Sequence, residues 1–321
     1  MSTEAARPAG ATLVAARRGP AHATGSPGRL LWRRFLRHQL AVASAVLLLL
    51  LAAASLAAPL VAAGLGHDPN AVDLFARFAP PGAGHPLGTD ELGRDLLLRL
   101  LYGGQVSLFV GLVGALAAAV LGTLVGLVAG YVGGRTDALL MRFTDAVIAL
   151  PLLPLLIVLA ALDLSKLGLP AALAHSEAAS LYRILAIIAL VGWTTVARLV
   201  RGTTLSVRER DFIRAAVAQG AGPLRIMLRH VLPNVVSPII VATTLSIGNV
   251  ILIESVLSFL GLGIQPPLPS WGNMLTNAQE LIWQAPFLAI YPGLLIFATV
   301  IAFNFLGDGL QDAMDPRAIE P

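Results

Sequence analysis

An uncharged run from residue 100 to residue 134 constrains this chain more than any other feature. A helix needs about 20 apolar residues to cross the roughly 30 Å hydrocarbon core of a bilayer. Inside lipid the backbone N–H and C=O groups have no water to bond, so a single crossing segment has to be helical. The run therefore predicts a membrane-spanning helix at 107–132.

Five other apolar segments are long enough to cross a bilayer. The chain is 56% hydrophobic and 12% charged, against about 25% charged in soluble proteins. We therefore predict an all-α, polytopic membrane protein with six transmembrane helices. The predicted spans are 40–63, 107–132, 146–162, 178–197, 237–257 and 285–306. The third contains Pro151 and Pro154, and Arg183 near one end of the fourth is expected to snorkel.

The chain divides into four predicted segments. Residues 1–28 are rich in Ala, Gly, Pro and Arg and are predicted to be a disordered cytoplasmic tail. Residues 29–65 hold the first span, which is too long and too far from residue 1 for a cleaved signal sequence. An external loop is predicted at 66–105, and a core domain with five spans at 106–321.

The positions of arginine and lysine predict the orientation. One set of loops and tails (1–39, 133–145, 198–230 and the C-terminal tail) carries 17 of these residues, and the alternate set carries 5. Cytoplasmic loops carry the excess of positive charge. Both termini are therefore predicted to be cytoplasmic. The arginines lie beside hydrophobic spans, so we interpret the basic pI as membrane orientation and predict no nucleic-acid partner.

The loop between the fourth and fifth spans has the pattern of two short helices. Asp211 is a plausible N-cap for a helix through Gln219. Residues 220–222 (Gly-Ala-Gly) break it, and Pro223 suits the first position of the next helix. Two interpretations remain open. The small side chains of this loop form a contact for another protein, or the loop is a solvated connection whose arginines only set the orientation.

Residues 214–220 (RAAVAQG), continuing to Ile226 and to 230–234 (HVLPN), resemble the "EAA" loop of binding-protein-dependent ABC importer permeases. In that family the short helix of this loop docks in a cleft of the ATPase subunit. The chain departs from the pattern at Arg214, where the motif has glutamate, at Gln219, where leucine is common, and at Gly222, where serine is common. Arg214 therefore puts in doubt any salt bridge assigned to the glutamate.

Further segments narrow the resemblance to the dipeptide/oligopeptide/nickel permeases, and to the C-type partner of the pair. They are 85–95 (HPLGTDELGRD), 130–135 (GYVGGR), 257–263 (LSFLGLG), 265–272 (QPPLPSWG) and the tail from 307 to 317. The resemblance covers about residue 30 to the end. Several separate motifs in the same order make it far more specific than any one of them.

The resemblance implies a type I ABC importer permease in the bacterial cytoplasmic (inner) membrane. It implies as partners a second homologous permease subunit, two cytoplasmic ATP-binding subunits, an extracytoplasmic solute-binding protein and membrane lipid. The coupling segment, 205–232, would receive the ATPase. Its predicted contact residues are Arg214, Ala215, Ala216, Gln219, Gly220, Ala221, Gly222 and Pro223. Family members import dipeptides, longer peptides, nickel or glutathione, and nothing in the chain selects among them.

No catalytic residue and no cofactor is predicted in this chain. A phosphate-binding loop needs Gly-Lys-Ser or Gly-Lys-Thr, and the sole lysine is Lys166, on the predicted outer side. The histidines are scattered, so no metal site is predicted. An ion- or proton-coupled secondary transporter is the alternative function, and an uncoupler that stops uptake while ATP stays high would favour it. An intramembrane protease finds no support, because the spans hold neither paired Asp residues nor His-Glu-x-x-His.

Some single residues allow two interpretations each. Glu254 is an acid well inside a span, which is costly; it either makes structural hydrogen bonds near the water-accessible outer end of its helix or lines the pathway. Gly122, Gly126 and Gly130 form a smooth stripe for packing within the subunit or against a partner permease. Trp271 is expected at the membrane interface, in a loop that either contacts the delivery protein or simply turns at the surface. Asp90 is expected to cap a short helix through Leu101 rather than to bind substrate.

Overall fold

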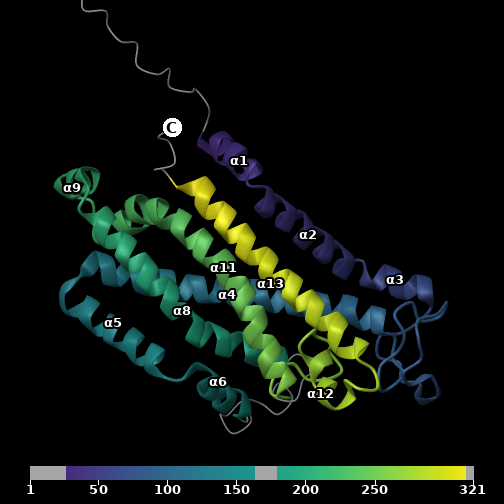
Figure 1. Ribbon diagram of the computed structural model, residues 1–321. Helices are drawn as coiled ribbons and strands as arrows, with labels where there is room; N and C mark the ends of the chain where they lie inside the picture. The colour runs from purple at the N-terminus through teal and green to yellow at the C-terminus, as the bar shows by residue number, and fades with distance from the viewer. Residues whose placement is uncertain (1–26, 163–178, 316–321) are drawn as a thin grey trace, which may run out of the picture.

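The computed structural model describes residues 27–162 and 179–315, and this part of the chain is built from helices (Figure 1). The predicted all-α class is confirmed. In chain order the elements are α1 (Pro27–Arg37), α2 (Gln39–Leu56), α3 (Ala58–Leu65), η1 (Leu74–Ala76), α4 (Leu96–Val132), α5 (Gly134–Ala149), α6 (Leu152–Ala161), α8 (Ala179–Arg208), α9 (Asp211–Ala218), α10 (Pro223–Ile226), the π turn η3 (Met227–Val231), α11 (Leu232–Phe259), η4 (Asn273–Leu275), α12 (Ala278–Leu281) and α13 (Phe287–Met314).

Five helices in the described ranges are long and apolar enough to cross a bilayer. They are α2, α4, α8, α13 and the continuous helix from α10 through α11. The pair α5 and α6 is bent by 87° and makes a sixth if it forms one span. This agrees with the six predicted spans. The predicted N-terminal tail falls outside the described residues except at its end, where Pro27 already begins α1.

The bend between α5 and α6 follows from Pro151. Proline has no N–H to continue a helical ladder, and its ring disfavours helical backbone in the residue before it. Leu150 accordingly has an extended backbone, with φ −73° and ψ 136°. α5 therefore ends at Ala149 and α6 begins at Leu152, in a span that the sequence predicts as continuous.

Several helices extend beyond the predicted spans. α4 begins at Leu96 rather than at 107, because a carboxylate oxygen of Asp95 accepts the N–H of Leu98 at 2.8 Å and caps the helix. The predicted outer loop 66–105 is therefore shorter in the structure, because its last ten residues belong to α4. α8 continues to Arg208, and α13 to Met314. The extensions of α8 and α13 are polar ends, which hydropathy does not detect, whereas the extension of α4 is mostly apolar and is interrupted by the charge of Arg99.

The glycine stripe of α4 packs against α8 inside the subunit. A Cβ added at Gly126 would lie 2.6 Å from the carbonyl oxygen of Ala197 and 2.8 Å from Cβ of Val200. At Gly122 and Gly130 it would meet α8 equally closely, at 2.5 Å and 2.7 Å. Small residues let two helices approach at backbone distance in a membrane. Of the two interpretations of the stripe, packing within the subunit is confirmed.

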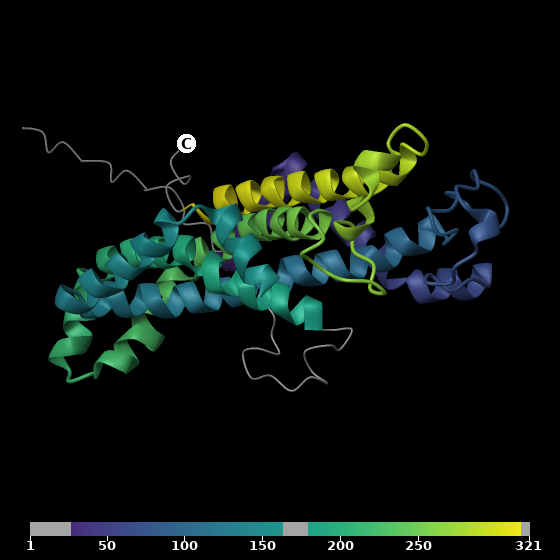
Figure 2. The ribbon, with the colours of Figure 1, turned by 90° about the horizontal axis from the view of Figure 1, so that it is seen from below.

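Different segments of the chain lie at the two ends of the molecule. In both ribbon views α9 and the last turns of α13 lie at one end, and α12 and residues 66–95 lie at the other (Figures 1 and 2). A cluster of buried apolar side chains joins the elements at the α9 end: Leu127, Val196, Val200, Val207, Ile213, Ile226, Val231 and Val235. A larger apolar cluster includes Trp271 and continues to the other end.

Candidate functional site

The helix α9 presents one face to the protein and one to its surroundings. Ile213 and Ala216, three residues apart, are buried on its inner face. Ile213 belongs to the cluster that also contains Val207 of α8 and Ile226 of α10. Arg214, Ala215 and Gln219 are exposed. Of the predicted contact residues, the structure therefore turns Ala216 inward.

The break after α9 is the predicted one, at Gly220. Gly220 has φ +81°, a left-handed conformation that favours glycine. Its N–H donates to the carbonyl of Val217 at 2.9 Å, and the N–H of Ala221 donates to that of Ala216 at 3.1 Å. Pro223 then occupies the first turn of α10. Asp211 is the first residue of α9 rather than its cap; Arg210 holds the cap position without a side-chain bond.

The coupling segment is braced against the neighbouring helices. Arg208, at the end of α8, donates from Nη1 to the carbonyl of Tyr131 at 2.9 Å, near the end of α4. Two turns earlier, Arg201 donates to both carboxylate oxygens of Asp137 in α5, at 2.5 and 2.6 Å. Such paired bonds fix orientation as well as distance. The sequence does not predict that Arg201 pairs with Asp137 or Arg208 with Tyr131, because these partners lie 64 and 77 residues apart in the chain.

The outer face of the segment exposes apolar side chains. Phe212 is 41% and Val217 54% exposed, and Leu224 and Leu228 are exposed beyond the glycine break. Beside them lies an open groove of about 480 Å³, lined in part by Tyr131, Val217 and Pro223. A group of exposed apolar side chains on a polar loop is typical of a surface that meets another protein.

Arg214, which stands where the motif has glutamate, makes two local ion pairs. Its guanidinium lies 3.5 Å from Glu209 and 3.8 Å from Asp211. All three side chains are well exposed, and exposed pairs of this kind contribute only about 0–1 kcal/mol. The ion pairs of Arg214 do not cover Ala215 or Gln219, so both remain exposed on the outer face of α9.

Glu254 lies in the protein interior and is not accessible to water. Its side chain is fully buried, and its Oε1 accepts the hydroxyls of Ser258 at 2.7 Å and of Ser270 at 2.9 Å. Ser258 and Ser270 in turn accept the N–H groups of Ile264 and Asn273. The expected water-accessible position is wrong, and the geometry is that of structural hydrogen bonding. The network ties α11 to the chain that follows it.

We predict that Glu254→Gln is mild and Glu254→Leu severe. Glutamine keeps an oxygen for both hydroxyls, whereas leucine leaves two buried hydroxyls without an acceptor, at about 1–3 kcal/mol each. The thermal unfolding midpoint of the purified protein measures the difference. Ser270→Ala is the control, since it removes one of the two donors and should fall between the variants. A Glu254→Leu protein as stable as wild type would contradict this role.

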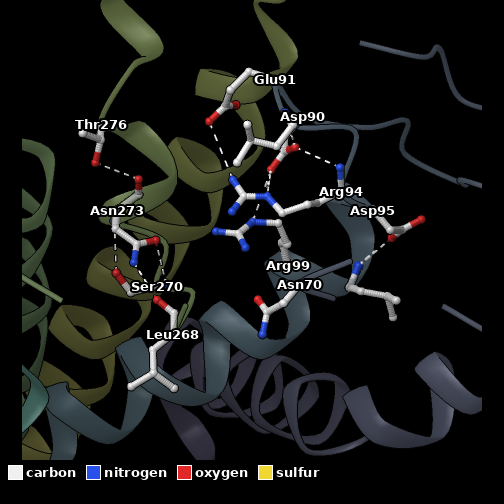
Figure 3. A network of polar contacts seen from close by, with 12 residues as sticks. Asn70, Asp90, Glu91, Arg94, Asp95, Arg99, Leu268, Ser270, Asn273 and Thr276 are labelled. Atoms are coloured by element: carbon white, nitrogen blue, oxygen red, sulfur yellow. Dashed lines mark hydrogen bonds and ion pairs between the residues drawn. The ribbon is translucent and has the colours of Figure 1, made fainter. Parts of the chain in front are cut away.

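Asp90 organises a polar cluster at the end opposite the coupling segment (Figure 3). One of its oxygens accepts the N–H groups of Leu92 and Arg94, and the other lies 2.7 Å from Nε of Arg94 and 3.5 Å from Nε of Arg99. The expectation that Asp90 caps a helix is wrong: Asp95 does so. Asp90 instead folds the turn before α4, because its two oxygens satisfy both backbone and guanidinium donors.

Trp271 is a core residue rather than an interfacial one. It is 1% exposed, its indole N–H donates to the carbonyl of Leu100 at 2.9 Å, and its backbone N–H donates to Ser107 Oγ at 3.1 Å. Gly103 and Gly104 leave the room for its ring. The segment between α11 and α13 is therefore folded onto α4 at this point, and is more than a turn at the membrane surface.

Within the described ranges, no three His, Asp or Glu side chains are grouped closely enough to hold a metal ion. At the coupling segment the charged side chains Arg208, Glu209, Asp211 and Arg214 form ion pairs with one another. The segment has the features of a protein contact surface: α9 is exposed and partly apolar, and its inner face packs against α8 and α10.

Comparison with known proteins gives matches along most of the chain. Residues 122–320 match the family described as "binding-protein-dependent transport system inner membrane component", and residues 26–81 match the "N-terminal TM domain of oligopeptide transport permease C". The chain is 40% identical to a glutathione transport system permease protein of Pectobacterium atrosepticum, over 91% of this chain and 92% of that one. It is 38% identical to an oligopeptide transport system permease protein of Haemophilus influenzae, over 90% of each chain. A dipeptide transport system permease protein of Alkalihalophilus pseudofirmus is also 38% identical, over 91% of this chain and 90% of that one.

Proposed function

Because the chain belongs to the family of binding-protein-dependent transport system inner membrane components, we propose that it imports peptides or related small solutes with energy from ATP hydrolysed on partner chains. It is a multi-pass membrane permease subunit of an ABC importer. The family favours this function over an ion-coupled transporter. The named cargoes of its relatives (glutathione, oligopeptides and dipeptides) support the proposed substrate class.

The observation that carries the proposal is the geometry of the coupling segment. An ATPase that docks there would meet the exposed side chains of α9 and Gly220. The inner face of α9 is fixed to α8 and α10 through Ile213, so a push on α9 moves these helices rather than bending a loose loop. We propose two ATP-binding subunits, one for this segment and one for the equivalent segment of a second permease.

Force at the coupling segment has a continuous route across the membrane. The helix from Pro223 to Phe259 is a single unit of 37 residues, or about 55 Å at about 1.5 Å per residue. At its far end Glu254 holds Ser270. A tilt of this helix would therefore displace the segment that carries Ser270 and open or close the pathway, which we place between the two permeases. Solute would arrive on an extracytoplasmic binding protein.

We propose that the coupling segment and both termini face the cytoplasm. The arginine and lysine distribution, 17 against 5, supports this orientation. The chain has no cysteine, so a single introduced thiol reports its side of the membrane. Ala215 and Gln279 are both exposed, and they lie on α9 and α12, at opposite ends (Figure 1).

In spheroplasts, we expect a membrane-impermeant maleimide to label Gln279→Cys and to leave Ala215→Cys unlabelled until the membrane is permeabilised. Both variants should label in detergent, which controls for thiol reactivity. The reverse pattern would place α9 outside and would remove the proposed contact with a cytoplasmic ATPase.

Energy coupling is tested by uptake of radiolabelled dipeptides, glutathione and nickel into cells that lack or regain this chain. We expect uptake of a peptide-class solute that stops when ATP is depleted. Uptake abolished by an uncoupler at unchanged ATP would support a secondary transporter instead.

A further inference from the structure

A cavity of about 460 Å³ lies within the membrane-spanning part of the subunit. It is bounded by the break between α5 and α6, by α8 and by α11, and Glu254 is not among its lining residues. Its size falls within the range of about 300–1,000 Å³ for small-molecule sites. Its lining is mainly apolar and includes no charged side chain among the described residues.

Four polar side chains line this cavity: Thr194, Thr195, Ser246 and Asn249. Two of them are occupied by their own helices, since Thr194 Oγ1 donates to the carbonyl of Val191 and Ser246 Oγ to that of Ala242. Among the residues that the structure describes, the side chains of Thr195 and Asn249 have no hydrogen-bond partner, and both residues are exposed. The cavity therefore offers one free hydroxyl and one free carboxamide.

The position of Asn249 along its membrane-spanning helix suggests a role for its free carboxamide. Asn249 lies within the predicted membrane span 237–257, ten residues before the end of α11 or about 15 Å along the helix, so we expect it in the interior of a hydrocarbon core about 30 Å thick. A polar group there is costly unless it faces a cavity or a partner. Asn249 faces a cavity, so the free carboxamide has a place for a polar ligand group.

We propose that this cavity is a cargo subsite that takes an uncharged, amide-bearing part of a short peptide, with Asn249 pairing to its backbone amide. This inference rests on the proposed function and specifies its substrate class. A carboxamide has both donors and an acceptor, so it complements the N–H and C=O of a peptide group. The apolar walls suit small apolar side chains. A bare divalent cation finds no carboxylate or imidazole in the lining to replace its water.

The absence of native cysteine gives a direct test. We would place single cysteines at Asn249, at Thr195 and, as the matched control, at Leu49, which is exposed in the middle of α2 and does not line the cavity. N-ethylmaleimide is uncharged and reacts with thiolates, which form in contact with water. In membranes that carry the complete transporter, we expect Asn249→Cys and Thr195→Cys to react at least about tenfold faster than Leu49→Cys.

Dialanine or trialanine at millimolar concentration should slow labelling at Thr195→Cys, which keeps Asn249 in place, by about threefold or more, and Ni²⁺ or diglutamate should not. Labelling as slow as at Leu49→Cys would remove the cavity from the aqueous pathway. Fast labelling unaffected by alanyl peptides, or slowed instead by Ni²⁺ or diglutamate, would overturn the substrate class.

The proposed function has a separate readout. Failure of the wild-type transporter to take up any peptide with ATP would refute that function while leaving the labelling result valid. Normal peptide uptake with no protection at Thr195→Cys would refute only the subsite. Asn249→Leu gives a second measure: loss of the pairing between its carboxamide and the peptide group should raise the peptide concentration for half-maximal uptake about fivefold.

Discussion

Replacing Gly126 with leucine is expected to remove most of the folded protein from the membrane. A Cβ at this position already lies 2.6 Å from the carbonyl oxygen of Ala197 and 3.0 Å from the backbone nitrogen of Arg201. Both are backbone atoms of α8, so they cannot make room by a change of rotamer as a side chain can. Overpacking a well-packed core costs about 1–3 kcal/mol, occasionally more, and a leucine against backbone should reach or exceed that range.

The measurement is the amount of tagged protein in the membrane and its thermal unfolding midpoint in detergent. Gly126→Ala and Gly202→Ala form a matched pair, because both add one carbon to a helical glycine. An added Cβ at Gly202 meets nothing within 4 Å. We expect a clear loss for Gly126→Ala and none for Gly202→Ala. Equal, normal amounts of both, and of Gly126→Leu, would show that α4 and α8 do not pack as described.

Gly220→Asp is expected to abolish ATP-driven uptake while the protein still inserts and folds. Gly220 is exposed and has open space around it, so the added side chain meets nothing within this subunit. At a docked ATPase it would bury a carboxylate without a partner, at about 3 kcal/mol or more. That cost corresponds to about a hundredfold weaker association.

Gly220→Asn separates charge from conformation. Asparagine and aspartate have nearly the same shape, and both tolerate the left-handed backbone of Gly220 better than other side chains do. The asparagine variant should therefore keep more of the association than the aspartate variant. Copurification of the ATPase subunits and solute uptake are the two measurements. Full copurification together with full uptake by Gly220→Asp would show that the ATPase does not contact this turn.

The sequence predicts the coupling segment closely because its signals are local. The positive φ at the break favours glycine, and the start of the next helix tolerates proline. Gly220 and Pro223 therefore identify the turn without any knowledge of what lies around it. The apolar spans are equally local, since their length is set by the bilayer.

The sequence predicts long-range pairing poorly. Trp271 is expected at the interface, where tryptophan is common, but it packs against α4, and its partner Leu100 is 171 residues away. Glu254 is expected near water, but Ser270 reaches it from the following segment. Composition and helical period say which residues are apolar; they do not say which segment folds back to cover them.

The amino-acid sequence by itself determined that the chain is helical, that it crosses a membrane several times and where the coupling segment turns. These properties depend on the cost of unpaired backbone groups in lipid and on the backbone preferences of single residues. Only the tertiary structure decided that the glycines of α4 face α8, that Glu254 is sealed inside, and that Asn249 opens on a cavity. Each of these depends on which surfaces come within contact distance, and that is set by packing among helices far apart in the chain.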